Sequence, residues 1–258
     1  MVSLKSLKRF VIINSLVFSV AYIHYTVLVW VQYNLLVLWL TVLVENIIIH
    51  TCYSQLFASK KFITEGTRTQ QFNLANFVGG TLIHPVTILL VHTVTTGPPT
   101  SYFYDVITFI PMSFAFEILF DFFHYWTHRT AHTVPWIYRN LHKTHHEHQF
   151  IDINSTYHIG SLDVFLTVSV PFFLSASMIP VSDYSIMVLY WYKTIVEHAG
   201  HVGKEGGSSF PQFIWLPKVF GIELYSNDHN YHHVNGKYNF SKRLSLWDKV
   251  FGTYKDTR

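Results

Sequence analysis

Charged residues are scarce in this chain, and their scarcity limits where it can reside. Only 13% of its 258 residues are Asp, Glu, Lys or Arg, whereas 50% are hydrophobic. A soluble domain carries roughly 25% charged residues. Much of the surface must therefore face lipid, and a formal charge of +3 is too small to indicate a nucleic-acid partner.

Cysteine is almost absent as well. Cys52 is the only one, which excludes an internal disulfide and a cysteine-based metal site. A zinc-protease HExxH motif is also missing, because Phe150 stands where the segment beginning at His146 would need its second ligand. The Glu-x-x-His ligands of soluble di-iron bundles do not occur either.

Six apolar stretches approach the length of about 20 helical residues that a bilayer core requires. They cover residues 10–31, 35–50, 77–96, 104–123, 162–181 and 184–196. The second and the sixth are short, so the sequence predicts between four and six transmembrane helices. The first stretch is too long for a signal peptide and lacks a cleavage site, so we expect it to be retained.

Basic residues alternate with these stretches along the chain. Basic groups that include Lys5, Lys60 and Arg129 lie before the first stretch, after the second and after the fourth. The turns that follow the first, third and fifth stretches contain no Lys or Arg. The positive-inside rule then places the N-terminus and every histidine cluster on the cytosolic side.

Histidine is the residue that is abundant, and eight histidines form three short clusters. The motifs are HxxxH, HxxHH and HxxHH, formed by His128 and His132, by His142, His145 and His146, and by His229, His232 and His233. Residues three and four apart share a helix face, so each cluster should direct two or three imidazoles to one spot. Eight rings exceed the needs of one tetrahedral zinc ion, and they predict a pair of metal ions held by nitrogen.

Imidazole alone does not select the metal, because it suits zinc, copper, iron and nickel. We favour iron because so many histidines lie beside a bilayer, where alkyl chains are the available substrate. A two-iron centre can use dioxygen to attack such inert C–H bonds.

Further polar residues accompany the first cluster. Glu117, Asp121 and His124 precede His128 at intervals of three or four residues and would form one stripe with it. Asp121 could orient His124 or His128 through the ring nitrogen that a metal leaves free. His124 itself could be an additional ligand or part of a solvated helix face.

The segment Glu197-His198-Ala199-Gly200-His201 offers one more ligand. Either His198 or His201 could serve, with Glu197 as its orienting group, or both could be exposed at a helix end. His158 could lie near the site or on the surface. The single histidines within apolar stretches are interpreted as packed or hydrogen-bonded residues; they are His24, His50, His84 and His92.

At these residues the chain resembles the fatty acid hydroxylase/sterol desaturase superfamily of membrane non-haem di-iron enzymes. The similarity covers roughly residues 117–254. It is most specific at the histidine clusters, at Pro135-Trp136 and Tyr138 between the first two clusters, and at the ending LWDKVFGTY over residues 246–254.

The resemblance implies an all-α integral membrane protein with a cytosolic histidine-rich di-metal cap, usually in the endoplasmic reticulum. It implies N-terminal transmembrane hairpins over residues 1–116 and a catalytic domain over 117–258 with two further membrane segments. The implied cofactors are two iron ions, and their ligands would be His128, His132, His142, His145, His146, His229, His232 and His233, with His201 or His198 as a ninth.

The resemblance also implies oxygen-dependent hydroxylation, desaturation or demethylation of a lipid, with electrons from cytochrome b5 or a similar carrier and its reductase. The chain has no His-Pro-Gly-Gly haem-binding segment, so the reductant must be external. The chain departs from the family pattern at two places. It has His158-Ile159 where many relatives have His-Pro, and it has His124 where others have an aromatic residue.

Three functions remain open at this point. We expect a lipid hydroxylase acting on a fatty-acyl or sterol-like substrate, with desaturation or methyl oxidation as the alternative outcome. A non-catalytic metal-binding or metal-transport protein is the alternative from another class, and an inactive scaffold is a third. A transporter should distribute its histidines across several spans, whereas 13 of 17 lie at positions 124–233.

Overall fold

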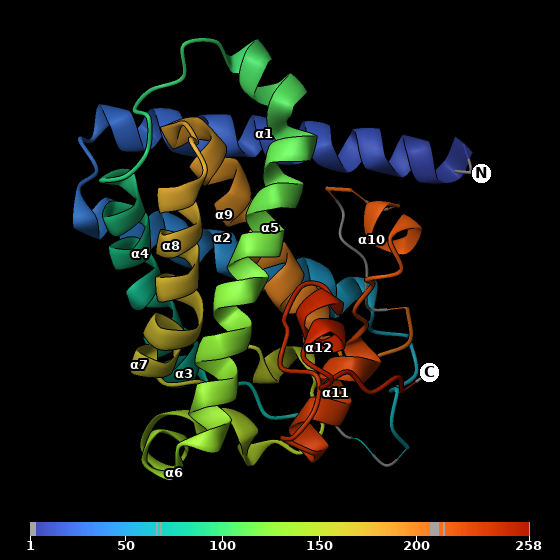
Figure 1. The fold of residues 1–258 in the computed structure, drawn as a ribbon. Helices are drawn as coiled ribbons and strands as arrows, with labels where there is room; N and C mark the ends of the chain where they lie inside the picture. Colours follow the sequence, from blue (N-terminus) through green and yellow to red (C-terminus); the bar gives the residue numbers. More distant parts are fainter. Residues whose placement is uncertain (1–3, 66, 68, 207–211, 214, 258) are drawn as a thin grey trace.

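The computed structural model is built from helices and describes residues 4–65, 67, 69–206, 212–213 and 215–257 (Figure 1). The longer helices are α1 (Leu4–Trp30), α2 (Leu35–Leu56), α3 (Leu74–Thr81), α4 (Ile83–His92), α5 (Tyr102–Thr133), α8 (Val170–Met178), α9 (Asp183–Gly200) and α11 (Ser226–Val234). The shorter ones are α6 (Pro135–Ile137), η1 (Tyr138–His142), η2 (His145–Glu147), η3 (Ile153–Ser155), α7 (Ser161–Val164), η4 (Phe165–Ser169), α10 (Leu216–Val219) and α12 (Leu246–Val250).

Among the described residues, five helical segments are long and apolar enough to cross a membrane. They are α1, α2, the pair α3–α4 over Leu74–His92, α5, and the run from α7 to α8 over Ser161–Met178. Five lies within the predicted range of four to six, so the prediction of an all-α integral membrane protein is confirmed.

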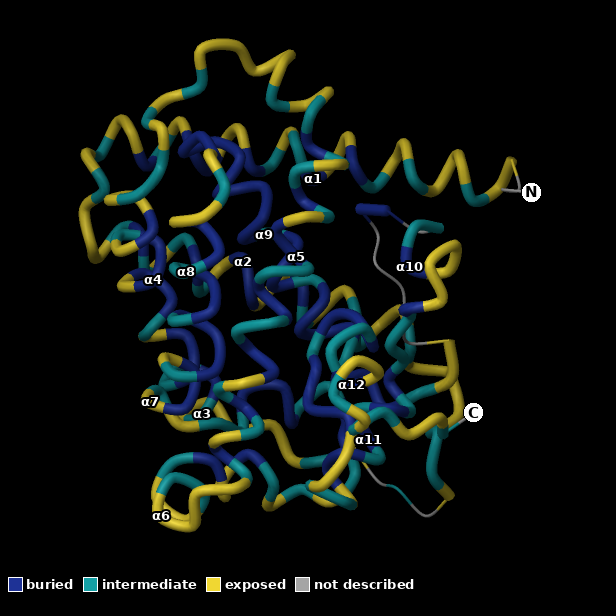
Figure 2. Tube along the Cα trace, in the orientation of Figure 1, coloured by how far each residue is buried: buried dark blue, intermediate teal, exposed yellow. Residues whose placement is uncertain are grey.

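The sixth predicted stretch, residues 184–196, has a different place. It forms most of α9, whose 18 residues include Asp183, Lys193 and Glu197 and of which 15 are buried. α9 packs against α1, α2 and α5, and Figure 2 shows it buried along most of its length. It is therefore the central helix of the bundle, enclosed by the lipid-facing helices, and its charges are shielded by protein.

Polar residues at the ends of the apolar stretches set where the helices begin. Asn34, Ser101 and Ser182 cap α2, α5 and α9, because each side chain accepts a hydrogen bond from a backbone N–H of the first turn. Between α1 and α2 the chain reverses at Gln32 and Tyr33, which adopt φ of 52° and 53°.

The main hydrophobic core lies between these helices. α8 packs against both α4 and α5, and α1 crosses their direction (Figure 1). Buried aromatic side chains such as Phe116, Phe120 and Phe172 fill the space between α5 and α8. A smaller apolar cluster that contains Phe213 and Leu244 lies beside α5 and α9.

The short helices that follow α5 and α9 form a cap around one end of the bundle. α11 contacts α9 and α12 contacts α5, which brings the C-terminal segment beside the loops that follow α5. The predicted boundary between residues 116 and 117 lies inside α5, and the division into two domains stays a prediction.

Candidate metal centre

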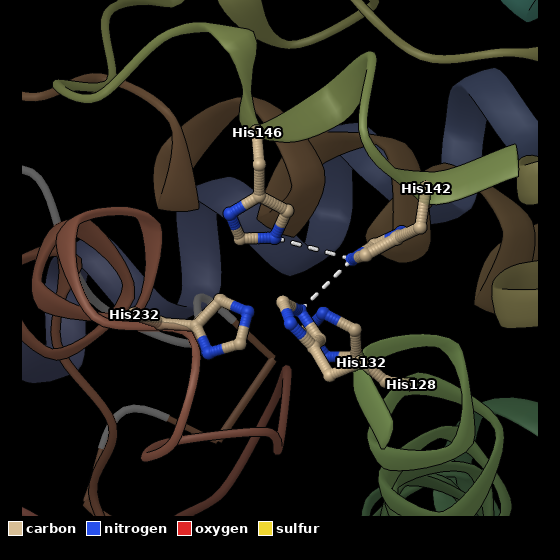
Figure 3. A group of neighbouring side chains, drawn as sticks. All are labelled: His128, His132, His142, His146 and His232. Atoms are coloured by element: carbon tan, nitrogen blue, oxygen red, sulfur yellow. Dashed lines mark hydrogen bonds between the residues drawn. The ribbon is translucent and has the colours of Figure 1, made fainter. Parts of the chain in front are cut away.

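Nine histidines converge in two adjacent groups, and within each group one ring nitrogen per residue lies within 4.8 Å of the others. The five-histidine group consists of His128, His132, His142, His146 and His232 (Figure 3). The four-histidine group consists of His145, His201, His229 and His233. The structure thus brings together all nine histidines that the sequence singled out as metal ligands.

Helix geometry explains which histidines share a group. Residues four apart lie on one face, so His142 stays with His146 and His229 stays with His233. The middle histidine of each HxxHH motif belongs to the other group: His145 lies in the four-histidine group and His232 in the five-histidine group. Two imidazoles of each HxxHH motif therefore point to one group, as expected, and the remaining one points to the other group.

The two groups are in direct contact. The ring centroid of His233 lies 4.6 Å from that of His145 and also 4.6 Å from that of His146. The adjacent residues His145 and His146 thus belong to different, neighbouring groups, and so do His232 and His233. Two ions held by these groups would be close enough to act on the same small molecule.

Five elements supply the histidines, among them η2, which carries His145 and His146. His128 and His132 come from α5, His142 ends the π-helical turn η1, His201 caps the C-terminus of α9, and the third cluster lies on α11. In η1 the N–H of Lys143 reaches back to the carbonyl of Tyr138 at 2.7 Å. Such single π-helical turns occur often at functional sites.

The Nδ1 atoms of four rings are hydrogen-bonded to backbone carbonyls outside the groups. Their partners are the carbonyls of Phe240 for His128, of Tyr238 for His232, of Glu197 for His201 and of His148 for His233, at 2.7, 2.7, 2.9 and 3.2 Å. A carbonyl can only accept, so each of these Nδ1 atoms carries the proton. The Nε2 atoms of the same rings are consequently bare.

The Nε2 atoms of neighbouring rings face one another inside each group. Nε2 of His142 lies 3.1 Å from Nε2 of both His132 and His146, and Nε2 of His201 lies 3.2 Å from that of His229. Nε2 of His232 and of His233 are buried without a hydrogen-bond partner. Converging lone pairs without a proton to share repel each other unless a cation lies between them.

A metal ion fits this arrangement. Two nitrogens bound to one ion at roughly 2.0–2.1 Å and a right angle are about 3 Å apart, close to the separations within the groups. Outer hydrogen bonds fix the rings and tautomers of His128, His142, His201, His232 and His233, as is usual for metal-binding histidines. The donor set is almost wholly nitrogen, which suits a transition metal better than calcium or magnesium.

Burial keeps the rings in the form that binds metal. Desolvation, reinforced by neighbouring histidines, lowers the pKa of His145, His229 and His233 well below its usual value. Burial lowers the pKa of His232 to about 4. These rings are neutral near pH 7, and neutral imidazole is the ligand form.

Asp163 is a site residue that the sequence reasoning missed. Its Oδ2 accepts a hydrogen bond of 2.8 Å from Nδ1 of His142, and both side chains are buried. A carboxylate behind a metal-ligand histidine fixes the ring and raises its basicity. The sequence feature that could have pointed to Asp163 is its position as a lone acidic residue at the start of an apolar stretch.

Asp121 does not have the predicted role. Its carboxylate accepts the backbone N–H groups of Lys242, Arg243 and Leu244 at 2.8, 2.9 and 2.9 Å. His124 instead directs Nδ1 to the carbonyl of Thr167 at 2.5 Å and lies next to His128, outside both groups. Asp121 therefore anchors the segment that follows Phe240. The backbone carbonyl of Phe240 is the group that accepts the hydrogen bond from Nδ1 of His128.

The structure separates His198 from His201. His201 belongs to the four-histidine group, whereas His198 lies outside it and packs against His50, Tyr53 and Tyr157. The side chain of Glu197 pairs with Lys242, and the hydrogen bonds of both rings go to backbone carbonyls, of Thr194 for His198 and of Glu197 for His201. Only its backbone carbonyl orients His201.

The remaining histidines also lie outside both groups. His24 contacts Thr41, His84 contacts Lys193, and His92 contacts Asp183. His50 packs among aromatic rings, and His158 bonds Glu147 and Asn76.

Comparison with known proteins identifies the family. The model of the fatty acid hydroxylase family matches residues 113–253, more than half of the chain, and this range contains all nine histidines and Asp163. The chain belongs to the fatty acid hydroxylase family. No solved structure matches it.

Several characterised proteins share this region. A fatty acid hydroxylase of Lecanicillium sp is 33% identical over 55% of this chain and 41% of its own length. A cholesterol 25-hydroxylase-like protein of Danio rerio is 28% identical over 53% and 52%, and a C-4 methylsterol oxidase of Schizosaccharomyces pombe is 31% identical over 54% and 45%. The chain spans about half the length of the relatives it matches.

Proposed function

We propose that this chain is a membrane-bound di-iron oxygenase that hydroxylates a lipid with O2 and with electrons from a cytochrome b5-type donor and its reductase. The observation that carries the proposal is the pair of adjacent histidine groups, each presenting bare ring nitrogens to a shared centre. Family membership supports iron as the metal and a lipid as the substrate.

Two bound iron ions would supply the activation of O2 that the cleavage of an unactivated C–H bond requires. The overall reaction converts RH, O2, two electrons and two protons into ROH and H2O. Since the lipid supplies only part of the reducing power, the other two electrons must come from an external donor. This balance is the chemical reason for a reductase partner.

The protein residues prepare the site in three ways. The five-histidine and four-histidine groups would each hold one ion. The carbonyls and Asp163 outside the groups keep the rings in a single orientation, so little reorganisation is needed when a metal binds. The buried rings of His142, His201 and His232, all at most 2% exposed, keep bulk water away from the centre.

The substrate class follows from the setting and from the relatives. The histidine groups lie at one end of a bundle of long apolar helices, so a hydrocarbon chain or a sterol ring system could approach from the bilayer. The matching proteins carry names that refer to fatty acids, cholesterol and methylsterols. Desaturation or methyl oxidation is the alternative outcome, because these reactions begin with the same hydrogen abstraction.

The proposed location is the endoplasmic reticulum, with the N-terminus and the histidine groups on the cytosolic side. The alternation of basic segments with uncharged turns supports this orientation. A cytosolic site would be accessible to a reductase at the membrane surface.

The test is product formation by purified, iron-loaded protein in detergent or nanodiscs with cytochrome b5, its reductase and a total lipid extract. We expect hydroxylated lipid that carries 18O from 18O2, and no product from His146→Ala. His148→Ala is the matched control, because the His148 ring lies outside both groups and packs against His158. Folded, iron-loaded protein that forms no oxidised lipid would overturn the proposal, and metal uptake into vesicles would favour transport.

A further inference from the structure

Lys242 contacts two helices that carry ligands of different histidine groups. Its backbone N–H donates to Oδ1 of Asp121 at 2.8 Å, and Asp121 lies on α5, which supplies two ligands of the five-histidine group. Its side-chain ammonium forms an ion pair with Oε1 of Glu197, which lies in the last turn of α9. That helix end is capped by His201 of the four-histidine group. Lys242 therefore joins the ligand-bearing part of α5 to the ligand-bearing end of α9.

The backbone at Lys242 is firmly attached to α5. The carboxylate of Asp121 also accepts the N–H groups of the two residues that follow Lys242, both at 2.9 Å. Two residues before Lys242, the carbonyl of Phe240 accepts Nδ1–H of His128 at 2.7 Å. The segment that carries Lys242 is thus fixed both to α5 and to a ring of the five-histidine group.

On the α9 side, one residue connects Lys242 to His201. The carboxylate of Glu197 pairs with Lys242, while its backbone carbonyl accepts Nδ1–H of His201 at 2.9 Å. The opposite nitrogen of that ring, Nε2, lies 3.2 Å from Nε2 of His229 inside the four-histidine group. Because both contacts belong to Glu197, a displacement of this residue would carry the His201 ring out of its place in the group.

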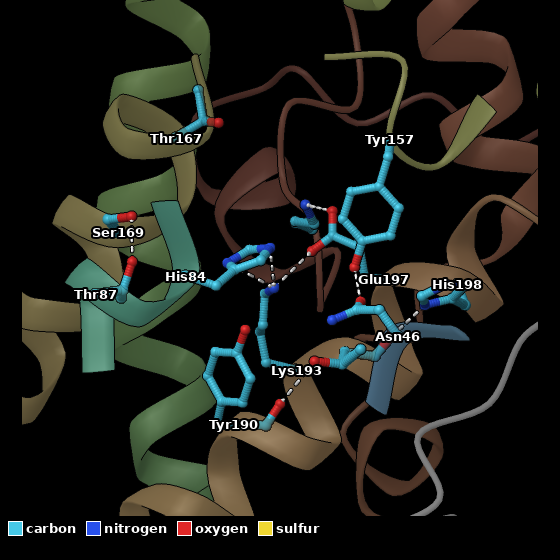
Figure 4. A network of polar contacts seen from close by, with 12 residues as sticks. Asn46, His84, Thr87, Tyr157, Thr167, Ser169, Tyr190, Lys193, Glu197 and His198 are labelled. Carbon is cyan, nitrogen blue, oxygen red and sulfur yellow. Dashed lines mark hydrogen bonds and ion pairs between the residues drawn. The ribbon is translucent and has the colours of Figure 1, made fainter. Parts of the chain in front are cut away.

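A second lysine beside Glu197 does not provide the same link. Lys193 lies 3.9 Å from Oε2 of Glu197 and 3.2 Å from Nε2 of His84, so it is held between the two side chains (Figure 4). Lys193 and Glu197 are about one turn apart on α9 itself. Their contact therefore cannot fix α9 against another segment. Of the two lysines, it is Lys242 that ties Glu197 to α5.

The ion pair of Lys242 and Glu197 is shielded from solvent. The two side chains are 14% and 9% exposed. With His201 and His229 they line a small cavity of about 40 Å³ beside the four-histidine group. Exposed ion pairs hold their partners weakly and are screened by salt, whereas shielded pairs are screened much less. The pair is thus placed to keep the end of α9 in one position.

We propose that Lys242 is a positioning residue, whose ion pair with Glu197 holds His201 in place relative to α5 and thereby sets the spacing between the two metal ions. This inference deepens the proposed function and rests on its two-metal site. Spacing matters because both ions have to act on the same small molecule, and a small misplacement of reacting groups costs a large factor in rate.

The experiment measures metal affinity and metal–metal distance in purified full-length protein in nanodiscs, without turnover. Metal-free protein is titrated with Fe2+ in the absence of oxygen, and X-ray absorption by fully loaded protein reports the distance between the ions. We expect Lys242→Met to bind the ion of the four-histidine group roughly 10–100-fold more weakly and to lose the single iron–iron distance of the wild type. Titration in a His232→Ala background, which retains only that ion, assigns the loss. Lys242→Arg keeps the ion pair and should restore both properties.

Two further variants separate positioning from stability. Lys193→Met is the matched control, because it removes the other lysine at Glu197 and leaves the link to α5; its iron affinity should equal that of the wild type. Lys242→Met combined with Glu197→Gln removes both partners of the ion pair, so no charge is left unpaired by the loss of one partner. Its thermal midpoint should recover toward the wild-type value while its iron affinity stays low. Recovery of the affinity together with the midpoint, or an equal loss in Lys193→Met, would overturn the proposal.

The outcomes for this role and for the proposed function differ. Unchanged iron affinity and iron–iron distance in Lys242→Met would overturn the positioning role alone. Wild-type protein that binds two iron ions at one distance but forms no oxidised lipid would overturn the oxygenase reaction alone. Wild-type protein that binds fewer than two ions would overturn both.

Discussion

Nδ1 of His142 lies 2.8 Å from Oδ2 of Asp163, and both side chains are buried within the protein. This contact joins the π-helical turn η1 to α7, the first turn of a membrane-spanning segment. It connects the five-histidine group to the helical bundle, and it directs Nε2 of His142 toward His132 and His146.

The first prediction concerns this contact. Asp163→Ala should weaken metal binding by the five-histidine group by roughly 10–100-fold, the usual cost of losing such an orienting carboxylate. Asp163→Asn should restore part of the affinity, because its amide oxygen can still accept from Nδ1. Metal titration of the metal-free proteins measures the affinities of both variants. Glu147→Ala, which changes an exposed residue, is the control. Equal affinities of Asp163→Ala and wild type would refute this role.

The second prediction follows from the division of the HxxHH motifs. His145→Ala should remove the metal of the four-histidine group, and His232→Ala should remove the metal of the five-histidine group. Each single variant should retain about half of the wild-type iron, and the double variant should retain almost none. Iron content and Mössbauer spectra measure these changes. Both single variants losing the same ion would contradict the division.

The third prediction separates two histidines that are three residues apart. His201→Ala should reduce the metal content, since its Nε2 faces that of His229 at 3.2 Å. His198→Ala should leave the metal content unchanged, because its ring packs against His50 and Tyr157. Metal analysis of the two variants side by side decides between them, and the reverse result would make His198 the ligand.

The fourth prediction assigns Asp121 to stability. Asp121→Ala leaves three backbone N–H groups without their acceptor, and each such loss costs about 1–3 kcal/mol. We expect a lower thermal unfolding midpoint in detergent, both with and without metal. An effect confined to the metal-loaded protein would show instead that Asp121 acts by orienting a ligand.

The fifth prediction is a loss of stability of the metal-free protein in acid. A histidine of the unfolded chain titrates near pH 6.5, whereas burial lowers the pKa of His232 to about 4 in the folded chain. Between these values the unfolded chain binds more protons, so stability falls as the pH falls. Thermal midpoints of chelator-treated protein should decrease from about pH 7 to pH 5. A constant midpoint would mean that these rings titrate normally.

The sequence predicted the identity of the nine converging histidines better than their arrangement. Helical spacing correctly joins His142 to His146 and His229 to His233, because four residues complete about one turn. It could not show that His145 and His232 cross between groups, since that depends on how η2 and α11 pack together. The same limit applies to Asp121, whose partners lie more than a hundred residues away in sequence.

The burial of α9 shows a second limit of prediction from the sequence. Residues 184–196 are apolar enough to suggest a membrane span, yet α9 lies inside the bundle. Hydropathy reports how apolar a segment is, but lipid and a protein core are both apolar surroundings. Lys193 and Glu197 gave the available signal, because charged side chains in a span usually face protein.

The most direct test of the central claim is the metal content of the purified wild-type chain, measured together with anomalous X-ray scattering at the iron edge. The account predicts two iron ions per chain, one between the rings of the five-histidine group and one between those of the four-histidine group. A single zinc ion, or metal located away from these nine histidines, would contradict it.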